Sequence, residues 1–199
     1  MAAMLAQAAL ALSLVVRVYD TYGVQPAALA AAQSAVGRIL KDAHLRVTWA
    51  ECPCAASVGP AELVIRIAAA PAGSEPASLG FSYVDVDRKA GTLATVFADR
   101  VGMLAGAAGA DEGELLGRAM AHEIGHLLLG TRDHDRASLM RGQWTTRELE
   151  SNRPWDWTLS RKDGATMRQA VVRRMREPAR PAAVIAAGAW PAPEDVRAP

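Results

Sequence analysis

The chain has 199 residues, of which 51% are hydrophobic and 22% are charged, and its formal net charge is +1 at neutral pH. These values indicate a globular protein with one well-buried domain. The small net charge excludes a strong electrostatic attraction to nucleic acid or to anionic lipid.

The N-terminus is an apolar run that continues to Val16 and contains several alanines. No lysine or arginine precedes the run, so residues 1–13 are either a leader or signal remnant or an extension of the first strand. We expect a secreted or periplasmic protein, with a cytoplasmic one as the alternative. We expect no integral membrane segment, because no stretch has the roughly 18 to 20 uncharged apolar residues that span a membrane.

The first half of the chain reads as one strand, one helix and then four strands. Residues 14–19 are rich in β-branched residues, which predicts a strand. Pro26 opens an alanine-rich helix, since proline is tolerated in the first helical turn. The apolar pattern predicts four further strands, at residues 44–49, 62–68, 81–87 and 92–98.

A long helix is predicted next, over residues 111–129. Asp111 and Glu114 form a capping-box pattern at its start. Gly130 ends the helix, because glycine adopts the left-handed conformation most readily. Two more helices are predicted downstream, at residues 145–150 and 159–175.

These elements predict a single domain over residues 14–176. Residues 14–130 form the sheet and the long helix, and residues 131–176 form a small helical C-terminal part. Residues 177–199 are rich in alanine and proline, which predicts a disordered tail. The expected fold class is α+β, with a twisted mixed sheet of four or five strands, an N-terminal helix and a central helix.

The two cysteines, Cys52 and Cys54, are separated by one residue. A disulfide between such close neighbours would be strained. Paired metal ligands, free thiols and an intermolecular disulfide are therefore alternatives, and the redox compartment stays open.

The residues that carry chemistry lie inside the long helix, where His122, Glu123 and His126 form the pattern HExxH. Residues four apart share one helix face, so the two imidazoles can be directed at one point. Zinc accepts such nitrogen ligands at about 2.0 to 2.1 Å. Glu123 lies about 100° further around the helix and can act as a base towards water on the metal. A random chain of this composition would contain the motif only about 1% of the time, so we predict one catalytic zinc ion.

Catalytic zinc sites normally have three protein ligands and leave the fourth position to water. Because Gly130 ends the helix, the chain can fold back and present His134 to the same point, and we predict His134 as the third ligand. Asp133 is an alternative ligand, or a partner that orients a histidine. Glu148 and Glu150 of the next helix are a further alternative.

The stretch HEIGHLLLGTRDH, followed by SLM, resembles the metzincin clan of zinc metallopeptidases, whose pattern is HExxHxxGxxH or D before a methionine turn. It also resembles uncharacterised bacterial proteins with HEIGHLLLG and a nearby histidine. The resemblance implies a zincin-like fold, with His122, His126 and His134 as zinc ligands and Glu123 as the catalytic base. It further implies Gly130 as the turn glycine and Met140 as the methionine beneath the metal.

The chain departs from the metzincin pattern after the second histidine. Strict spacing would place the third ligand at Arg132, which cannot bind zinc. Either the loop is two residues longer than in the family and His134 is the ligand, or Asp133 replaces it.

The resemblance implies a hydrolase, a zinc-dependent endopeptidase that cleaves peptide or protein substrates with a zinc-bound water that Glu123 activates. It also implies that residues 92–98 form the edge strand that pairs with an extended substrate, with a core strand as the alternative. Trp144 is a candidate wall of the substrate pocket, or else a core tryptophan. Two other functions are a catalytically silent zinc-binding module and a zinc hydrolase of a non-peptide amide.

Overall fold

The computed structural model describes residues 12–52 and 58–176. The predicted tail and nearly all of the predicted leader lie outside these ranges. The elements in chain order are β1 (Leu12–Asp20), α1 (Pro26–Asp42), β2 (Leu45–Glu51), β3 (Glu62–Ala68), β4 (Gly80–Asp85), β5 (Ala90–Phe97), α2 (Ala98–Ala108), α3 (Glu112–Leu129), α4 (Thr146–Ser151), the short 3-10 helix η1 (Pro154–Trp157) and α5 (Arg161–Arg176).

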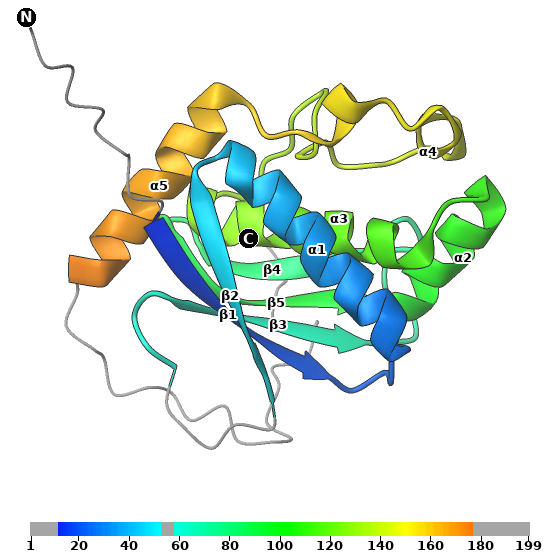
Figure 1. Ribbon diagram of the computed structural model, residues 1–199, viewed down its shortest axis with the longest axis horizontal. Coiled ribbons are helices and arrows are strands. Elements are labelled where there is room, and N and C mark those ends of the chain that lie inside the picture. Colours follow the sequence, from blue (N-terminus) through cyan, green and yellow to red (C-terminus); the bar gives the residue numbers. More distant parts are fainter. Residues whose placement is uncertain (1–11, 53–57, 177–199) are drawn as a thin grey trace, which may run out of the picture.

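The five strands form one mixed sheet in the order β2-β1-β3-β5-β4 (Figure 1). Strands β1, β2, β3 and β5 are parallel, and β4 pairs antiparallel with β5. The α+β prediction with a mixed sheet is confirmed at this level.

The expectation that residues 92–98 form an edge strand is wrong. Residues 92–97 belong to β5, which lies between β3 and β4, so the alternative of a core strand is the one observed. Ala98 is the first residue of α2. The burial of the two strands gives the reason: β5 contributes Ala94 and Val96 to the core, whereas Val84 is the one buried residue of β4. The less apolar strand therefore takes the edge position.

Helices α1 and α3 pack against each other over the sheet, and α3 crosses β5 and β4 (Figure 1). Small residues allow the two helices to approach closely. A β-carbon added at Gly117 of α3 would lie 2.5 Å from the carbonyl oxygen of Ala32 in α1. The contact fixes the position of α3, which carries the HExxH motif.

Helix α3 begins and ends where the sequence predicts. The Asp111 carboxylate accepts a hydrogen bond from the backbone N–H of Glu114 (2.7 Å), and Gly130 adopts φ 67° at the C-terminal end. The Glu114 side chain pairs with Arg38 and Arg118. Helix α3 is buried along nearly its whole length, so its functional side chains lie inside the protein.

Two elements, α2 and η1, are absent from the sequence prediction. Helix α2 buries Val101, Ala105 and Ala108 at helical spacing. Its interior also contains Gly102 and Gly106, each of which disfavours a helix by about 1 kcal/mol relative to alanine. Because of these two glycines, the sequence of α2 does not read as a helix.

Cys52 follows β2 and is disulfide-bonded, whereas Cys54 lies outside the described residues. Cys52 is therefore not a free thiol, and it does not belong to the group of side chains, described below, that could hold a metal ion.

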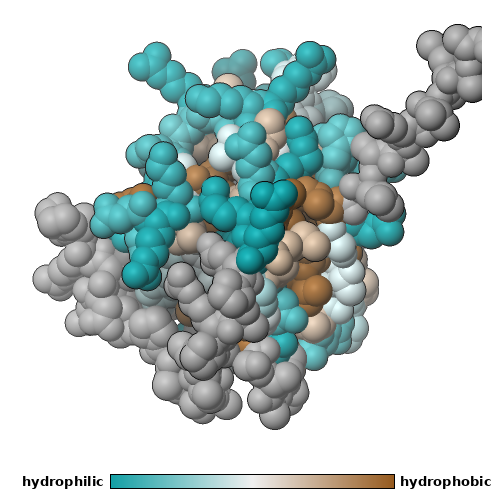
Figure 2. Space-filling view, turned by 90° about the vertical axis from the view of Figure 1, so that its left-hand side faces the viewer, coloured by the Kyte–Doolittle hydropathy of each residue, from teal (hydrophilic) through white to brown (hydrophobic). Residues whose placement is uncertain are grey.

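Figure 2 shows the side of the molecule on which α5 lies. Hydrophilic side chains predominate there, with smaller hydrophobic areas between them. None of the helices in the described residues is both long enough and apolar enough to cross a membrane.

Candidate metal centre

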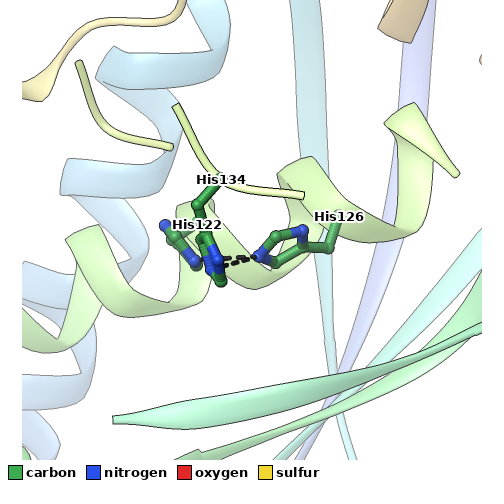
Figure 3. Close-up of side chains that lie close together, drawn as sticks. All are labelled: His122, His126 and His134. Carbon is green, nitrogen blue, oxygen red and sulfur yellow. Dashed lines mark hydrogen bonds between the residues drawn. The ribbon is translucent and has the colours of Figure 1, made fainter. Parts of the chain in front are cut away.

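Three histidine side chains converge on one point (Figure 3). The Nε2 atom of His126 lies 3.0 Å from Nε2 of His122 and 3.2 Å from Nε2 of His134. The ligand atoms of all three residues lie within 4.8 Å of one another. His122 and His126 come from adjacent turns of α3, and His134 comes from the loop that follows it.

The loop after α3 makes two tight turns before it reaches His134. Gly130 takes the left-handed conformation and packs on the backbone of Lys89, where a β-carbon would overlap. The Thr131 hydroxyl donates to the Asp133 carboxylate (2.9 Å) and accepts from the Asp133 backbone N–H (3.0 Å). The two additional residues are thus taken up in a compact turn, and His134 reaches the centre.

The alternative ligands lie elsewhere in the structure. The Asp133 carboxylate is engaged with Thr131, and Asp133 is outside the convergent group. Glu148 accepts hydrogen bonds from Thr145 in the cap of α4, and Glu150 is exposed on the same helix. Among the described residues, His134 alone joins His122 and His126.

Backbone carbonyls orient both helix histidines. The Nδ1 atom of His122 lies 2.9 Å from the Leu139 carbonyl oxygen, and Nδ1 of His126 lies 2.9 Å from that of Thr131. Because a carbonyl oxygen only accepts, each Nδ1 carries the proton and each Nε2 has a free lone pair. This is the arrangement by which proteins orient metal-ligating histidines.

Burial keeps both helix histidines neutral. It lowers the pKa of His122 to about 3, with a further contribution from the nearby His126. It also lowers the pKa of His126 to about 4. Neutral imidazole is the form that binds metal ions, so these two ligands need not lose a proton at neutral pH.

Two of the three separations in the histidine group are compatible with a tetrahedral metal ion. Lone pairs on imidazole nitrogens this close repel one another unless a cation lies between them. A tetrahedral zinc ion with bonds of about 2.05 Å would separate two ligand nitrogens by about 3.3 Å. The separations of 3.0 and 3.2 Å are close to that value, so the three histidines could hold a metal ion.

Glu123 lies beside this centre and is 6% exposed. The Ser82 hydroxyl of β4 donates a 2.6 Å hydrogen bond to its carboxylate. Burial raises the pKa of Glu123 to about 7, although the bond from Ser82 acts in the opposite direction. Gly80 also faces this carboxylate, because a β-carbon there would lie 3.0 Å from Glu123 Oε1. Strand β4 thus positions an acid that can both accept and release a proton near neutral pH.

Met140 lies underneath α3 and is 2% exposed. It ends a turn in which the Asp135 backbone N–H donates to the Met140 carbonyl (2.9 Å) and Ser138 has φ 74°. A β-carbon on Gly125 would lie 2.5 Å from the Met140 sulfur. The absence of a side chain at Gly125 therefore allows the methionine to pack directly against the helix between the two histidines.

Trp144 lines a cavity and also packs against the hydrophobic core. Its ring lies edge-on to His122, with centroids 5.8 Å apart, and edge-on to Trp157 at 5.4 Å. The guanidinium groups of Arg118 and Arg141 lie over the Trp157 ring at 4.1 and 5.0 Å. This cluster connects the metal centre to the C-terminal helical part.

A cavity of about 390 Å³ opens onto the centre. Its lining includes the three histidines, Glu123, Arg132, Trp144 and the segment from Ala77 to Ser82, which leads into edge strand β4. The convergent histidines, the buried acid and the edge strand of the sheet therefore border one cavity.

No protein-family model and no characterised protein matches this chain. The metzincin resemblance therefore rests on the motif residues alone, and function has to be inferred from the chemistry of the site.

Several contacts that position the histidines and Glu123 could not be predicted from the sequence. Ser82 is 41 positions from Glu123, and nothing in the local pattern of its strand indicates their contact. The carbonyls of Thr131 and Leu139 belong to irregular backbone. Gly125 is the exception, because a glycine inside a buried helix suggests close packing against a neighbour.

Proposed function

We propose that the protein is a zinc-dependent endopeptidase. The observation that carries the proposal is that one cavity is lined by three converging histidines and by the buried carboxylate of Glu123. Structural zinc sites usually have four protein ligands, whereas three ligands beside an open cavity are typical of catalytic sites.

His122, His126 and His134 would hold the ion. A zinc ion in that position supplies a Lewis acid that polarises the carbonyl of the scissile bond and lowers the pKa of water. The protein contributes the fixed Nε2 directions of the two helix histidines, which are buried together with Glu123, whereas His134 is exposed.

Glu123 is the proposed general base. With a pKa near 7, it can take a proton from the attacking water and then deliver it to the leaving amine. Ser82 holds one oxygen of the carboxylate, so the other oxygen, which faces Gly80, is available for this transfer.

Strand β4 supports a peptide as the substrate. It is an edge strand, and its first residues line the cavity. An extended peptide can add to such an edge through main-chain hydrogen bonds. A small non-peptide amide would make no use of this edge.

The decisive experiment combines metal analysis with peptide cleavage. We expect purified protein to contain one zinc ion per chain and to cleave members of a random peptide library at internal bonds. Replacing Glu123→Gln should abolish cleavage and leave zinc bound. A zinc-loaded wild type that hydrolyses no substrate would favour a catalytically silent zinc-binding module. Hydrolysis of non-peptide amides but of no peptide would favour a zinc hydrolase of non-peptide amides.

A further inference from the structure

Arg132 lines the same cavity as the histidines and Glu123. Among residues 12–52 and 58–176, no carboxylate lies within ion-pair distance of its guanidinium. Its Nη2 donates one hydrogen bond, to the backbone carbonyl of Val84 in β4 (3.3 Å). The remaining N–H groups of the guanidinium are therefore available to a ligand.

The other arginine of the cavity is not available in this way. Arg141 is 7% exposed, and its guanidinium lies 3.5 Å from the Glu148 carboxylate and 3.9 Å from that of Asp156. It also lies over the ring of Trp157. Its charge is balanced by these two carboxylates, so Arg132 is the arginine of this cavity for which the described residues supply no ion-pair partner.

The loop that carries Arg132 is held on both sides. Gly130 packs on the backbone of Lys89, and the side chains of Thr131 and Asp133 bond to each other. The neighbouring acid, Asp133, is thereby turned to the Thr131 hydroxyl instead of the guanidinium. The turn that takes up the two additional residues before His134 thus also places Arg132 at the cavity.

The contacts that Arg132 and Glu123 make with β4 indicate how far apart the two side chains lie along this strand. Arg132 contacts β4 at Val84, whereas Glu123 contacts the same strand at Ser82. Two residues of a strand span at most about 7 Å, and the register of β4 shifts between Tyr83 and Val84. A peptide laid along this edge would therefore meet the guanidinium within about two residues of the bond next to Glu123.

We propose that Arg132 binds a carboxylate of the substrate within about two residues of the cleaved bond, an inference that rests on the proposed peptidase function. A guanidinium binds carboxylates through two parallel charge-assisted hydrogen bonds. The carboxylate is either the side chain of an acidic residue or the C-terminus of the peptide, and these two sources can be separated by experiment.

The test measures peptide binding to the zinc-loaded full chain with Glu123→Gln, which does not turn the peptide over. Three probes share the segment acetyl-Ala-Ala-Leu-Ala and differ in the last residue, which is alanine with a free carboxylate, alanine amide or glutamate amide. Isothermal titration gives the Kd of each probe. The matched control is Arg136→Gln, because Arg136 is exposed on the same loop and does not line the cavity.

We expect Arg132→Gln to weaken the binding of at least one carboxylate probe by about tenfold and to change that of the neutral amide by less than about twofold. Arg136→Gln should change none of them. An effect on the free carboxylate indicates recognition of a C-terminus, and one on the glutamate probe indicates recognition of an acidic side chain.

Two results would overturn the inference. Equal weakening of charged and neutral probes would mean that Arg132 only ties its loop to β4, and unchanged binding of all probes would exclude carboxylate recognition. In either case cleavage of peptides by the wild type would leave the peptidase function standing. Zinc-loaded protein that neither binds nor cleaves any peptide would remove the proposed function and this inference together.

Discussion

The sulfur of Met140 lies 2.5 Å from the position that a β-carbon on Gly125 would occupy. Gly125 stands between Glu123 and His126, so the methionine packs on the part of α3 that carries the histidines. Turn 135–140 and helix α3 are thereby held together at the centre. The Leu139 carbonyl, which orients His122, belongs to the same turn.

Replacing Gly125→Ala should therefore strain the packing of Met140. We expect the metal-free protein to lose about 1–2 kcal/mol of unfolding free energy, since overpacking a core has costs of that size. Chemical denaturation measures the change. A smaller loss in a Met140→Ala background would confirm that the two residues are coupled.

Gly106→Ala is the matched control for this substitution. Gly106 also lies inside a helix, but no atom lies within 4 Å of the position of its β-carbon. The alanine should be neutral or stabilising by up to about 1 kcal/mol, because it favours the helix. If Gly125→Ala behaved like this control, the proposed close packing of Met140 would be incorrect.

The third ligand gives a second prediction. His134→Ala should lower zinc affinity by more than about 100-fold, because even residues that only orient a ligand contribute 10- to 100-fold. Competition with a chelator of known affinity measures the change. Asp133→Asn is the control, and we expect it to alter the affinity by only a few-fold, since Asp133 bonds to Thr131. A larger loss of zinc affinity in Asp133→Asn than in His134→Ala would indicate that Asp133 is the ligand.

The sequence predicted the parts of the site that depend on local spacing. Helical periodicity, the Asp111 cap and Gly130 located α3 correctly, and they placed His122 and His126 on one face. The predicted return of the chain to bring His134 beside them is also observed. Each of these features depends on residues close together in the chain.

Features that depend on distant pairing could not be predicted in this way. The sequence pattern indicates a strand at β4 and another at β5, but it does not show how they pair. In the structure β5 pairs with both β3 and β4, whereas β4 pairs with β5. The contact between Ser82 and Glu123 follows from that arrangement. Arg132 was recognised only as a residue that cannot bind zinc, because its place in the cavity depends on the turn and on β4.

The hydrogen bond from Ser82 to Glu123 gives a third prediction. The bond stabilises the ionised carboxylate and lowers its pKa. Its removal in Ser82→Ala should raise that pKa, so the acidic limb of the pH profile of kcat/KM should move to higher pH. We also expect kcat to fall by about tenfold, because a base that is not held in position transfers protons less efficiently. A shift to lower pH, or an unchanged profile, would contradict this role of Ser82.

Arg100 of α2 gives the last prediction, because it fixes the segment that forms one rim of the cavity. Its guanidinium donates to the Ser78 carbonyl (2.8 Å), to the Ser74 carbonyl (3.1 Å) and hydroxyl (2.6 Å), and to the Glu75 carbonyl. Glu75 and Ser78 line the cavity. Arg100 is therefore expected to act through the shape of the rim, without touching the reacting groups.

Replacing Arg100→Ala should raise KM several-fold and leave kcat nearly unchanged, because the histidines and Glu123 keep their own partners. Limited proteolysis should show faster cleavage within residues 69–79. The control is Arg88→Ala, since Arg88 forms an exposed pair with Asp85, and such pairs contribute only about 0–1 kcal/mol. A fall in kcat with unchanged KM would mean that Arg100 affects the catalytic groups themselves, and equal effects of both substitutions would exclude a specific role for the rim.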